Sequence, residues 1–335
     1  MSKLRILIIS DGRAGHFHLS EGIAAALGRK QDVDTEYLQI NCNNYPGLAV
    51  SMMTRSWMSS QQILRIVYGL KMIALPDVDL VVSAGSKTLA ANICMSRLLN
   101  AANIFYGSLR RFRAQDFTLV LTSYPRQTRL APNIIHALKP SALDPDTLPS
   151  TNVNGRFGMV IGGPSRRINF SQNDWRILGN MMQNTHMLCG VRWSVSNSRR
   201  TPKEVNAMLS ALSKKKHSPI DEFIDVTSTR QKTLSDLFAK VSSVVCTADS
   251  SSMISEAVWA RKRVIAIEPN KFALTRNERN YRDWLESKGW IISYKLKEIE
   301  PEKLIWLFNA LKPMSHNPLD HLSKLLAEKI VCFDK

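Results

Sequence analysis

Three consecutive serines near residue 250 lie in the stretch of the chain that best suits ligand chemistry. In SSVVCTADSSSMISE, residues 242–256, β-branched residues predict a strand, and a polar loop leads from it into a helix. The backbone amides at a helix start attract anions, so these amides and the hydroxyls of residues 250–252 could hold a diphosphate. Glu256 lies about a turn further along, where it could accept hydrogen bonds from a ribose. The alternative is that Asp249 or Ser250 only caps the helix.

Two other loops in the second half of the chain combine small residues with arginines. One begins with Gly162-Gly163 after a predicted strand, and the other is SNSRRTP at residues 196–202. A guanidinium group matches phosphate oxygens with two parallel hydrogen bonds, so an arginine here could clamp a leaving phosphate, although a solvated loop is the alternative. We expect these loops and the serine stretch to form one anion pocket. The candidate binding residues of this pocket are Gly162, Gly163, Ser196, Arg199, Arg200, Asp249, Ser250, Ser251, Ser252 and Glu256.

The first loop of the chain, SDGRAGH at residues 10–16, also lies between a predicted strand and a predicted helix. Asp11 and His16 are the candidate catalytic residues, because either could act as a general base toward a bound hydroxyl. The alternative is that Asp11 caps the helix and His16 lies on the surface. The glycine spacing differs from the dinucleotide fingerprint, which disfavours a nicotinamide enzyme. Together with the SAGSKT loop at residues 83–88, this loop supplies the candidate acceptor-binding residues Gly12, Arg13, Gly15, Gly85 and Ser86.

Strand-like runs that alternate with amphipathic stretches must position these loops. The alternation predicts an α/β fold of two doubly wound, Rossmann-like domains that face each other across a cleft. Ligands in such sheets bind beyond the carboxyl ends of the strands, where all the candidate loops lie. We expect an N-terminal domain at 1–140, a linker at 141–154, a C-terminal domain with the anion pocket at 155–312, and a C-terminal helix at 313–335 that could pack back on the N-terminal domain.

Composition narrows the class of protein. Five cysteines lack the C-x-x-C spacing of a zinc site, which fits a reducing compartment, and no metal site is expected. The chain shows no signal-peptide core and no apolar run long enough to span a bilayer, so we expect a cytoplasmic protein. A formal charge of +17 suits phosphorylated ligands or an anionic membrane face. Nucleic acid is disfavoured, because the aromatic residues are not interleaved with the basic ones.

Four stretches resemble the signature blocks of one family. They are SDGRAGH, the GGPS that begins at Gly162, SNSRRTP and TADSSSMISEA, and they are similar to blocks of the mitochondrial-fission "elongated mitochondria" family over about residues 4–270. Bacterial members of that family are regarded as GT-B glycosyltransferases. The middle of the chain departs from the family pattern at residues 107–111 and 122–125. In outline, the second half also resembles the donor half of the peptidoglycan N-acetylglucosaminyltransferase, which implies that residues 250–252 meet the diphosphate and Glu256 the ribose.

The resemblance and the loops together predict an inverting glycosyltransferase that needs no metal or other cofactor. The resemblance implies that residues 1–140 form the acceptor domain, that residues 155–312 form the nucleotide-sugar-binding domain, and that the anion pocket binds the sugar donor. The partners of this enzyme would be a nucleotide sugar and a glycan or glycolipid acceptor of the cell envelope, of the lipopolysaccharide-core type. Asp11 would be the base, with His16 as second choice. Residues 51–75 could form an interfacial helix on the cytoplasmic face of the inner membrane, although a core-facing helix is the alternative. A non-catalytic membrane-fission adaptor and a nucleotide-sugar epimerase are the alternative functions.

Overall fold

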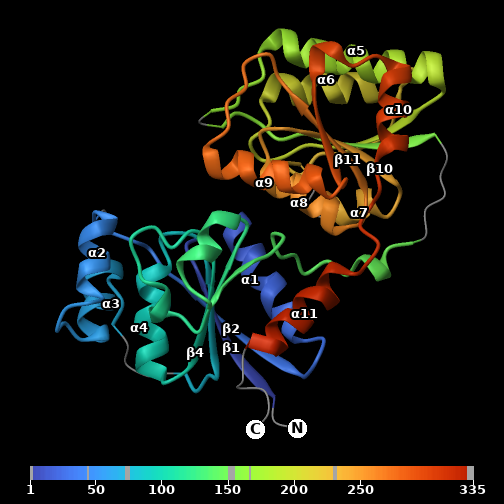
Figure 1. Cartoon of the computed structure of the whole chain (residues 1–335). Helices are drawn as coiled ribbons and strands as arrows, with labels where there is room; N and C mark the ends of the chain where they lie inside the picture. Colours follow the sequence, from blue (N-terminus) through green and yellow to red (C-terminus); the bar gives the residue numbers. More distant parts are fainter. Residues whose placement is uncertain are drawn as a thin grey trace. The chain divides into compact units, whose positions relative to one another are not determined.

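The chain forms two compact units, each built around a parallel β-sheet (Figure 1). The computed structural model describes residues 3–43, 45–71, 76–149, 155–165, 167–228 and 232–329. Unit 1 comprises Met1–Leu143 and Pro318–Lys335, and unit 2 comprises Asp144–Asn317. In each unit six strands pair in parallel, with helices on the two faces of the sheet. The predicted α/β fold of two doubly wound, Rossmann-like domains is therefore confirmed.

The sheet of unit 1 has the strand order β2-β1-β3-β4-β5-β6. Its strands are β1 (Leu4–Ser10), β2 (Val33–Gln39), β3 (Leu80–Ala84), β4 (Ala102–Tyr106), β5 (Leu119–Thr122) and β6 (Ile134–His136). Its helices are α1 (Ala14–Leu27), α2 (Gly47–Met53), α3 (Ser60–Tyr68), α4 (Leu89–Leu99) and α11 (Pro318–Lys329). Leu7 and Ile9 of β1 pack with α3 and α4, and the alternate residues Ile6 and Ile8 are equally buried. This burial of both faces explains why β1 reads as a continuous apolar run.

The sheet of unit 2 has the strand order β12-β11-β10-β7-β8-β9. Its strands are β7 (Arg156–Val160), β8 (Arg192–Ser196), β9 (Ile220–Ile224), β10 (Ser243–Thr247), β11 (Arg263–Glu268) and β12 (Ile291–Lys295). Its helices are α5 (Gln172–Cys189), α6 (Lys203–Ser213), α7 (Leu234–Phe238), α8 (Ser251–Trp259), α9 (Arg276–Ser287) and α10 (Pro301–Ala310). Figure 1 shows α5, α6 and α10 over one face of this sheet and α7, α8 and α9 over the other.

The chain leaves unit 1 after Leu143, within the predicted linker, and returns to it at Pro318, where α11 begins. Asp144 begins unit 2, and the amide of Asn317, at its end, donates to the carboxylates of Asp144 and Asp146. Residues 150–154 of the expected linker lie outside the described residues. Helix α11 belongs to unit 1 and packs against α1, with an ion pair between Asp320 and Arg29 at 3.0 Å (Figure 1).

Residues 51–75 do not form the single interfacial helix that their composition suggested. Helix α2 ends at Met53, and α3 buries Ile63, Leu64 and Val67 in the core of unit 1. The core-facing alternative therefore holds for α3, because its apolar residues recur at helical spacing toward α4. Residues 72–75 lie outside the described residues. No helix within the ranges given above is both long enough and apolar enough to cross a bilayer.

Candidate functional site

Helix α8 begins at the carboxyl end of β10, one of the two central strands of unit 2. Ser250 occupies its N-cap position, yet no side-chain capping bond to the first turn is present among the described residues. Helices α5 and α9 differ, since Ser171 and Thr275 accept hydrogen bonds from their first-turn amides. The alternative of a plain cap at Ser250 is therefore not supported, and a helix start of this kind, at the carboxyl end of a central strand, is a place where anions bind.

Around this helix start, the other predicted donor residues differ in exposure. Ser252 is exposed, Ser251 and Glu256 are half-buried, and Ser250 is nearly buried at 8% exposure. Glu256 lies five positions after Ser251, so it follows the exposed first turn on the same helix. Hydroxyls and a carboxylate are thus presented along α8, in the order in which a diphosphate and then a ribose would need them.

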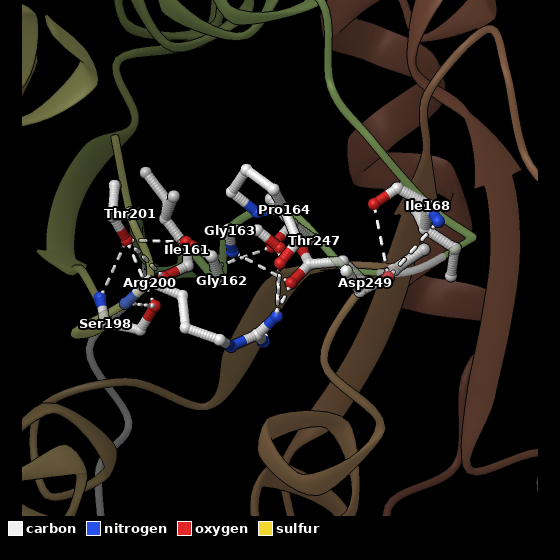
Figure 2. A network of polar contacts seen from close by, with 12 residues as sticks. Ile161, Gly162, Gly163, Pro164, Ile168, Ser198, Arg200, Thr201, Thr247 and Asp249 are labelled. Atoms are coloured by element: carbon white, nitrogen blue, oxygen red, sulfur yellow. Dashed lines mark hydrogen bonds and ion pairs between the residues drawn. The ribbon is translucent and has the colours of Figure 1, made fainter. Parts of the chain in front are cut away.

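Asp249, directly before α8, is the buried centre of a polar network (Figure 2). Its side chain is 0% exposed, and its Oδ2 accepts hydrogen bonds from the Gly163 amide at 2.8 Å and from Arg200 Nη2 at 3.0 Å. Arg200 Nη1 also donates to the carbonyls of Gly163 at 3.0 Å and Pro164 at 3.2 Å. Asp249 therefore ties the loops after β7 and β8 to the start of α8, a positioning role that the sequence did not predict, while its predicted contact with the donor stays a prediction.

The Gly162-Gly163 loop fits this network with no space for a side chain. The Gly162 amide donates to Thr247 Oγ1 at 2.7 Å, and Thr201 Oγ1 donates to the Gly162 carbonyl at 2.5 Å (Figure 2). A Cβ at Gly162 would lie less than 3.0 Å from the Asp249 carboxylate, and one at Gly163 less than 3.0 Å from the Arg200 carbonyl. The structure thus brings three predicted strand-end loops together, and their close approach explains both glycines.

Two predicted donor residues lie outside this network. Ser196 is 0% exposed, and its hydroxyl donates to the Asn197 carbonyl, so it has a structural place and not the predicted one facing a ligand. Arg199 is exposed, and within the described part of the chain its side chain makes no ion pair. Because Arg200 is held by Asp249, Arg199 is the arginine of this pair that remains available to a phosphate.

Arg282 on α9 is a residue that the sequence reasoning missed. It is 3% exposed and donates from Nη2 to the carbonyl of Ala248 at 2.6 Å, and burial lowers the pKa of its guanidinium. The neighbouring Tyr281 hydroxyl lies 2.7 Å from Ser255 Oγ on α8. Helix α9 therefore holds the loop before α8. An arginine in a helix rich in charged residues normally predicts a surface position, which is why no signal for this role was visible.

In unit 1, Asp11 and His16 form a hydrogen-bonded pair. His16 Nδ1 lies 2.9 Å from Asp11 Oδ2, and the Asp11 side chain is 2% exposed while that of His16 is 28% exposed. A carboxylate oxygen accepts, so Nδ1 carries the hydrogen and Nε2 is the nitrogen that can take a proton in neutral imidazole. This geometry would suit His16 as a general base that Asp11 orients, which is the reverse of the predicted order, and the role of either residue stays a prediction.

Gly85 and the predicted acceptor residues of the first loop lie next to this pair. The His16 ring lies where a Cβ of Gly85 would be, and Gly85 has a φ of +91°, so only glycine suits this position. The Arg13 amide donates to Asp11 Oδ1 at 3.3 Å, and the Gly12 amide donates to Ser10 Oγ at 3.2 Å. Three predicted residues have exposed or open positions, namely Arg13 and Ser86, which are exposed, and Gly15, where a Cβ would meet nothing within 4 Å.

Sequence comparison now identifies the family. The profile of the family described as "Mitochondrial fission ELM1" matches residues 14–330. The chain belongs to this family. The ELM1 match covers both units and confirms the family that the four signature stretches predicted. A comparison with curated protein sequences gave no significant match.

Solved structures share the fold of this ELM1-family chain at low sequence identity. MurG of Acinetobacter baumannii has 11% identity and a TM-score of 0.52, with 97% of this chain and 99% of that chain covered. A Neisseria meningitidis UDP-GlcNAc 2-epimerase bound to UDP-GlcNAc has 10% identity and a TM-score of 0.55, with 98% and 99% covered. The spinosyn forosaminyltransferase SpnP has 13% identity and a TM-score of 0.52, with 98% and 95% covered. The fold is therefore shared by sugar transferases and epimerases.

Proposed function

We propose that this chain is a glycosyltransferase that uses a nucleotide sugar. The observation that carries the proposal is the start of α8 at the carboxyl end of β10, where the N-cap residue Ser250 makes no capping bond and the helix leads to Glu256. The fold of MurG and of the forosaminyltransferase supports it, as does the Neisseria epimerase that holds UDP-GlcNAc on the same fold. In this proposal unit 2 binds the donor and unit 1 the acceptor.

The donor diphosphate would lie against the first-turn amides of α8. There the hydroxyls of Ser251 and Ser252 would donate to its oxygens, Arg199 would add a positive charge, and Glu256 would accept hydrogen bonds from the ribose. Asp249 would not repel the diphosphate, because Arg200 balances its charge. These fixed dipoles and charges would stabilise the departing nucleoside diphosphate, so we propose that transfer needs no metal ion.

On the acceptor side, His16 Nε2 would remove the proton of the attacking hydroxyl. The acceptor oxygen then forms a bond to the anomeric carbon as the bond from that carbon to the diphosphate oxygen breaks. Asp11 would stabilise the imidazolium that results, through its hydrogen bond to Nδ1. One displacement of this kind inverts the anomeric configuration.

For the acceptor we propose an envelope glycan or glycolipid of the lipopolysaccharide-core type, met by a cytoplasmic protein at the inner-membrane surface. The formal charge of +17 supports this proposal, because a basic protein is attracted to anionic lipid headgroups. The family description keeps a non-catalytic role in membrane fission as an alternative. An epimerase is the second enzyme candidate, because the Neisseria epimerase shares the fold over 98% of this chain.

Labelled nucleotide sugars, incubated with the protein with and without envelope lipids, separate these candidates. A transferase consumes the donor only with an acceptor and releases the nucleoside diphosphate, whereas an epimerase converts the donor without one. If no donor is turned over in either condition, both enzyme proposals fail and the adaptor remains.

Thermal unfolding in the presence of UDP, GDP, CMP or ADP tests the donor site itself. A ligand at 100 times its Kd stabilises the folded state by about 2.7 kcal/mol, so the nucleotide that fits should raise the Tm. The Glu256→Ala variant should lose this rise, and Glu302→Ala, an exposed carboxylate in the first turn of α10, is the matched control that should keep it. Equal rises in both variants would refute the placement of the ribose.

A further inference from the structure

Unit 1 contains a cavity of about 540 Å³ at the carboxyl edge of its sheet. Its wall comes from the segment after β2, from Ser86 and Lys87 after β3, and from Arg110 and Arg111 after β4. This is the edge at which parallel sheets of this type bind ligands. The loop after β3 also connects the cavity to the proposed base, because Gly85 lies against the His16 ring and Ser86 lines the cavity.

The wall of this cavity is apolar and positively charged. Tyr45, Leu48 and Val50 are among its apolar residues, and Lys87, Arg110 and Arg111 are its cations. None of the described residues that line it is acidic, and within the described part of the chain none of the three cations makes an ion pair. A wall of this kind suits an anion that carries a hydrocarbon chain.

Buried hydroxyl groups hold the cationic segments in place. Ser51, which is 1% exposed, donates to the Arg111 carbonyl at 2.7 Å, and Arg55 donates to the same carbonyl. Tyr68, which is 6% exposed, donates to the Lys87 carbonyl at 2.9 Å. Arg110 has a φ of +55°, a conformation that costs energy for any residue except glycine and is frequent at binding sites.

An exposed apolar surface lies next to the cavity on the same segment of the chain. Leu48 and Met52 are 48% and 60% exposed and lie one helical turn apart on α2. Trp57, which follows that helix, is 90% exposed. An exposed tryptophan beside aliphatic residues and arginines is typical of a surface that contacts the headgroup region of a membrane.

The geometry points to a site for the phosphorylated lipid end of the acceptor. Its phosphate would lie against Lys87, Arg110 and Arg111, with the first part of its chain along the apolar wall near Leu48. A cavity of this size accommodates one small ligand, which favours a single lipid molecule over a bilayer surface. The inference rests on the proposed function, because it names the class of acceptor: a lipid-linked phosphate whose sugar extends toward the loop that contacts His16.

The test uses the full chain and monomeric dihexanoyl phosphatidic acid, titrated and followed by calorimetry. Removing two of the three cations in R110Q/R111Q should weaken binding at least about tenfold, because charge-assisted bonds to a phosphate are lost. R126Q/R129Q, which removes two exposed arginines elsewhere in unit 1, is the control with the same charge change and should bind like wild type. Equal weakening in both variants would mean general surface attraction and would overturn the site.

Two further probes are informative. One separates the contribution of the lipid's hydrocarbon chain from that of its phosphate, and the other separates binding of a single lipid from binding to a bilayer. Inorganic phosphate should bind more weakly than phosphatidic acid, and equal affinity would overturn the role of the apolar wall. Trp57→Ser should weaken binding to vesicles of phosphatidylcholine and phosphatidylserine while leaving the monomeric lipid unaffected. If only vesicles bind, and the monomeric lipid does not, the single-lipid site is wrong.

Failure of this inference is separable from failure of the proposed function. The R110Q/R111Q variant should keep the wild-type Tm and its rise with nucleotide, which reports on unit 2 and on correct folding. Nucleotide binding with no lipid binding in the wild type would overturn the lipid site alone. Lipid binding that depends on Arg110 and Arg111, in a protein that turns over no donor, would leave the site standing and overturn the transferase.

Discussion

Gly162→Ala should disrupt the donor half of the protein although it adds only one methyl group. The new Cβ would lie less than 3.0 Å from the carboxylate of Asp249, so that carboxylate must move. Asp249 then loses its bond from the Gly163 amide at 2.8 Å and its pairing with Arg200 at 3.0 Å. The loops after β7 and β8 would no longer be tied to the start of α8.

The size of the effect follows from these two contacts. A hydrogen bond to a charged, buried acceptor contributes about 1.5–3 kcal/mol. The ion pair adds less, about 0.2–1 kcal/mol, because the Arg200 side chain is 44% exposed and solvent screens it. Gly162→Ala should therefore lower the free energy of unfolding by about 2–4 kcal/mol, which corresponds to a Tm lower by about 5–15 °C for a unit of this size.

Thermal unfolding with and without nucleotide measures both the stability and the site. Gly179→Ala is the matched control, since a Cβ there would lie 3.6 Å from Met208 Sδ and replaces a glycine within helix α5. That variant should be unchanged or stabilised by up to about 1 kcal/mol. A double-mutant cycle with Asp249→Ala isolates the steric overlap between the new Cβ and the carboxylate. Gly162→Ala should lower the free energy of unfolding only slightly once that carboxylate is gone. If it costs as much in that background, the steric reasoning is wrong.

Three further predictions concern catalysis, pH and capping. His16→Gln should lower the transfer rate by about 10²–10⁴-fold and Asp11→Asn should lower it too, both without loss of nucleotide binding; a wild-type rate in either variant would contradict the dyad. Burial lowers the pKa of Lys262 from 10.5 to about 8, so between these pH values the unfolded chain binds more protons than the folded one. The free energy of unfolding should therefore rise with pH from about 8 to about 10.5. Chemical denaturation should show this rise in the wild type and not in Lys262→Met. Ser171→Ala should cost about 1 kcal/mol in denaturant unfolding by removing the capping box of α5, and no change would contradict that role.

The fold was predictable because its signals are local and repeated. Apolar runs such as that of β1 alternate with helical periodicity, and the capping box at Ser171 and the left-handed Gly190 mark both ends of α5. The start of α1 was less visible, since its N-cap position, Arg13, provides no capping side chain. At α8 the sequence indicates a helix start with Ser250 as a possible cap, but only the structure shows that the Ser250 side chain makes no capping bond.

The site was predictable in its loops but not in the roles of single side chains. The sequence indicates that Asp249 and Arg200 lie at the same sheet edge, yet only the structure shows that they pair with each other. The sequence does not show that Asp11 is buried while His16 is partly exposed, or that the His16 ring packs against Gly85, a contact that joins residues far apart in the sequence. Long-range contacts of this kind leave no periodic signal, which is also why Arg282 was missed.

The division of unit 1 into two segments has a consequence for biosynthesis. Unit 2 lies between Leu143 and Pro318, so a ribosome completes it before it makes α11. Until then the surface of α1 that α11 covers is exposed. Leu319, Leu322 and Leu326 of α11 become buried when this helix packs against unit 1. Domains fold largely as units during synthesis, so unit 2 should be able to fold before unit 1, which is complete only once α11 has been made.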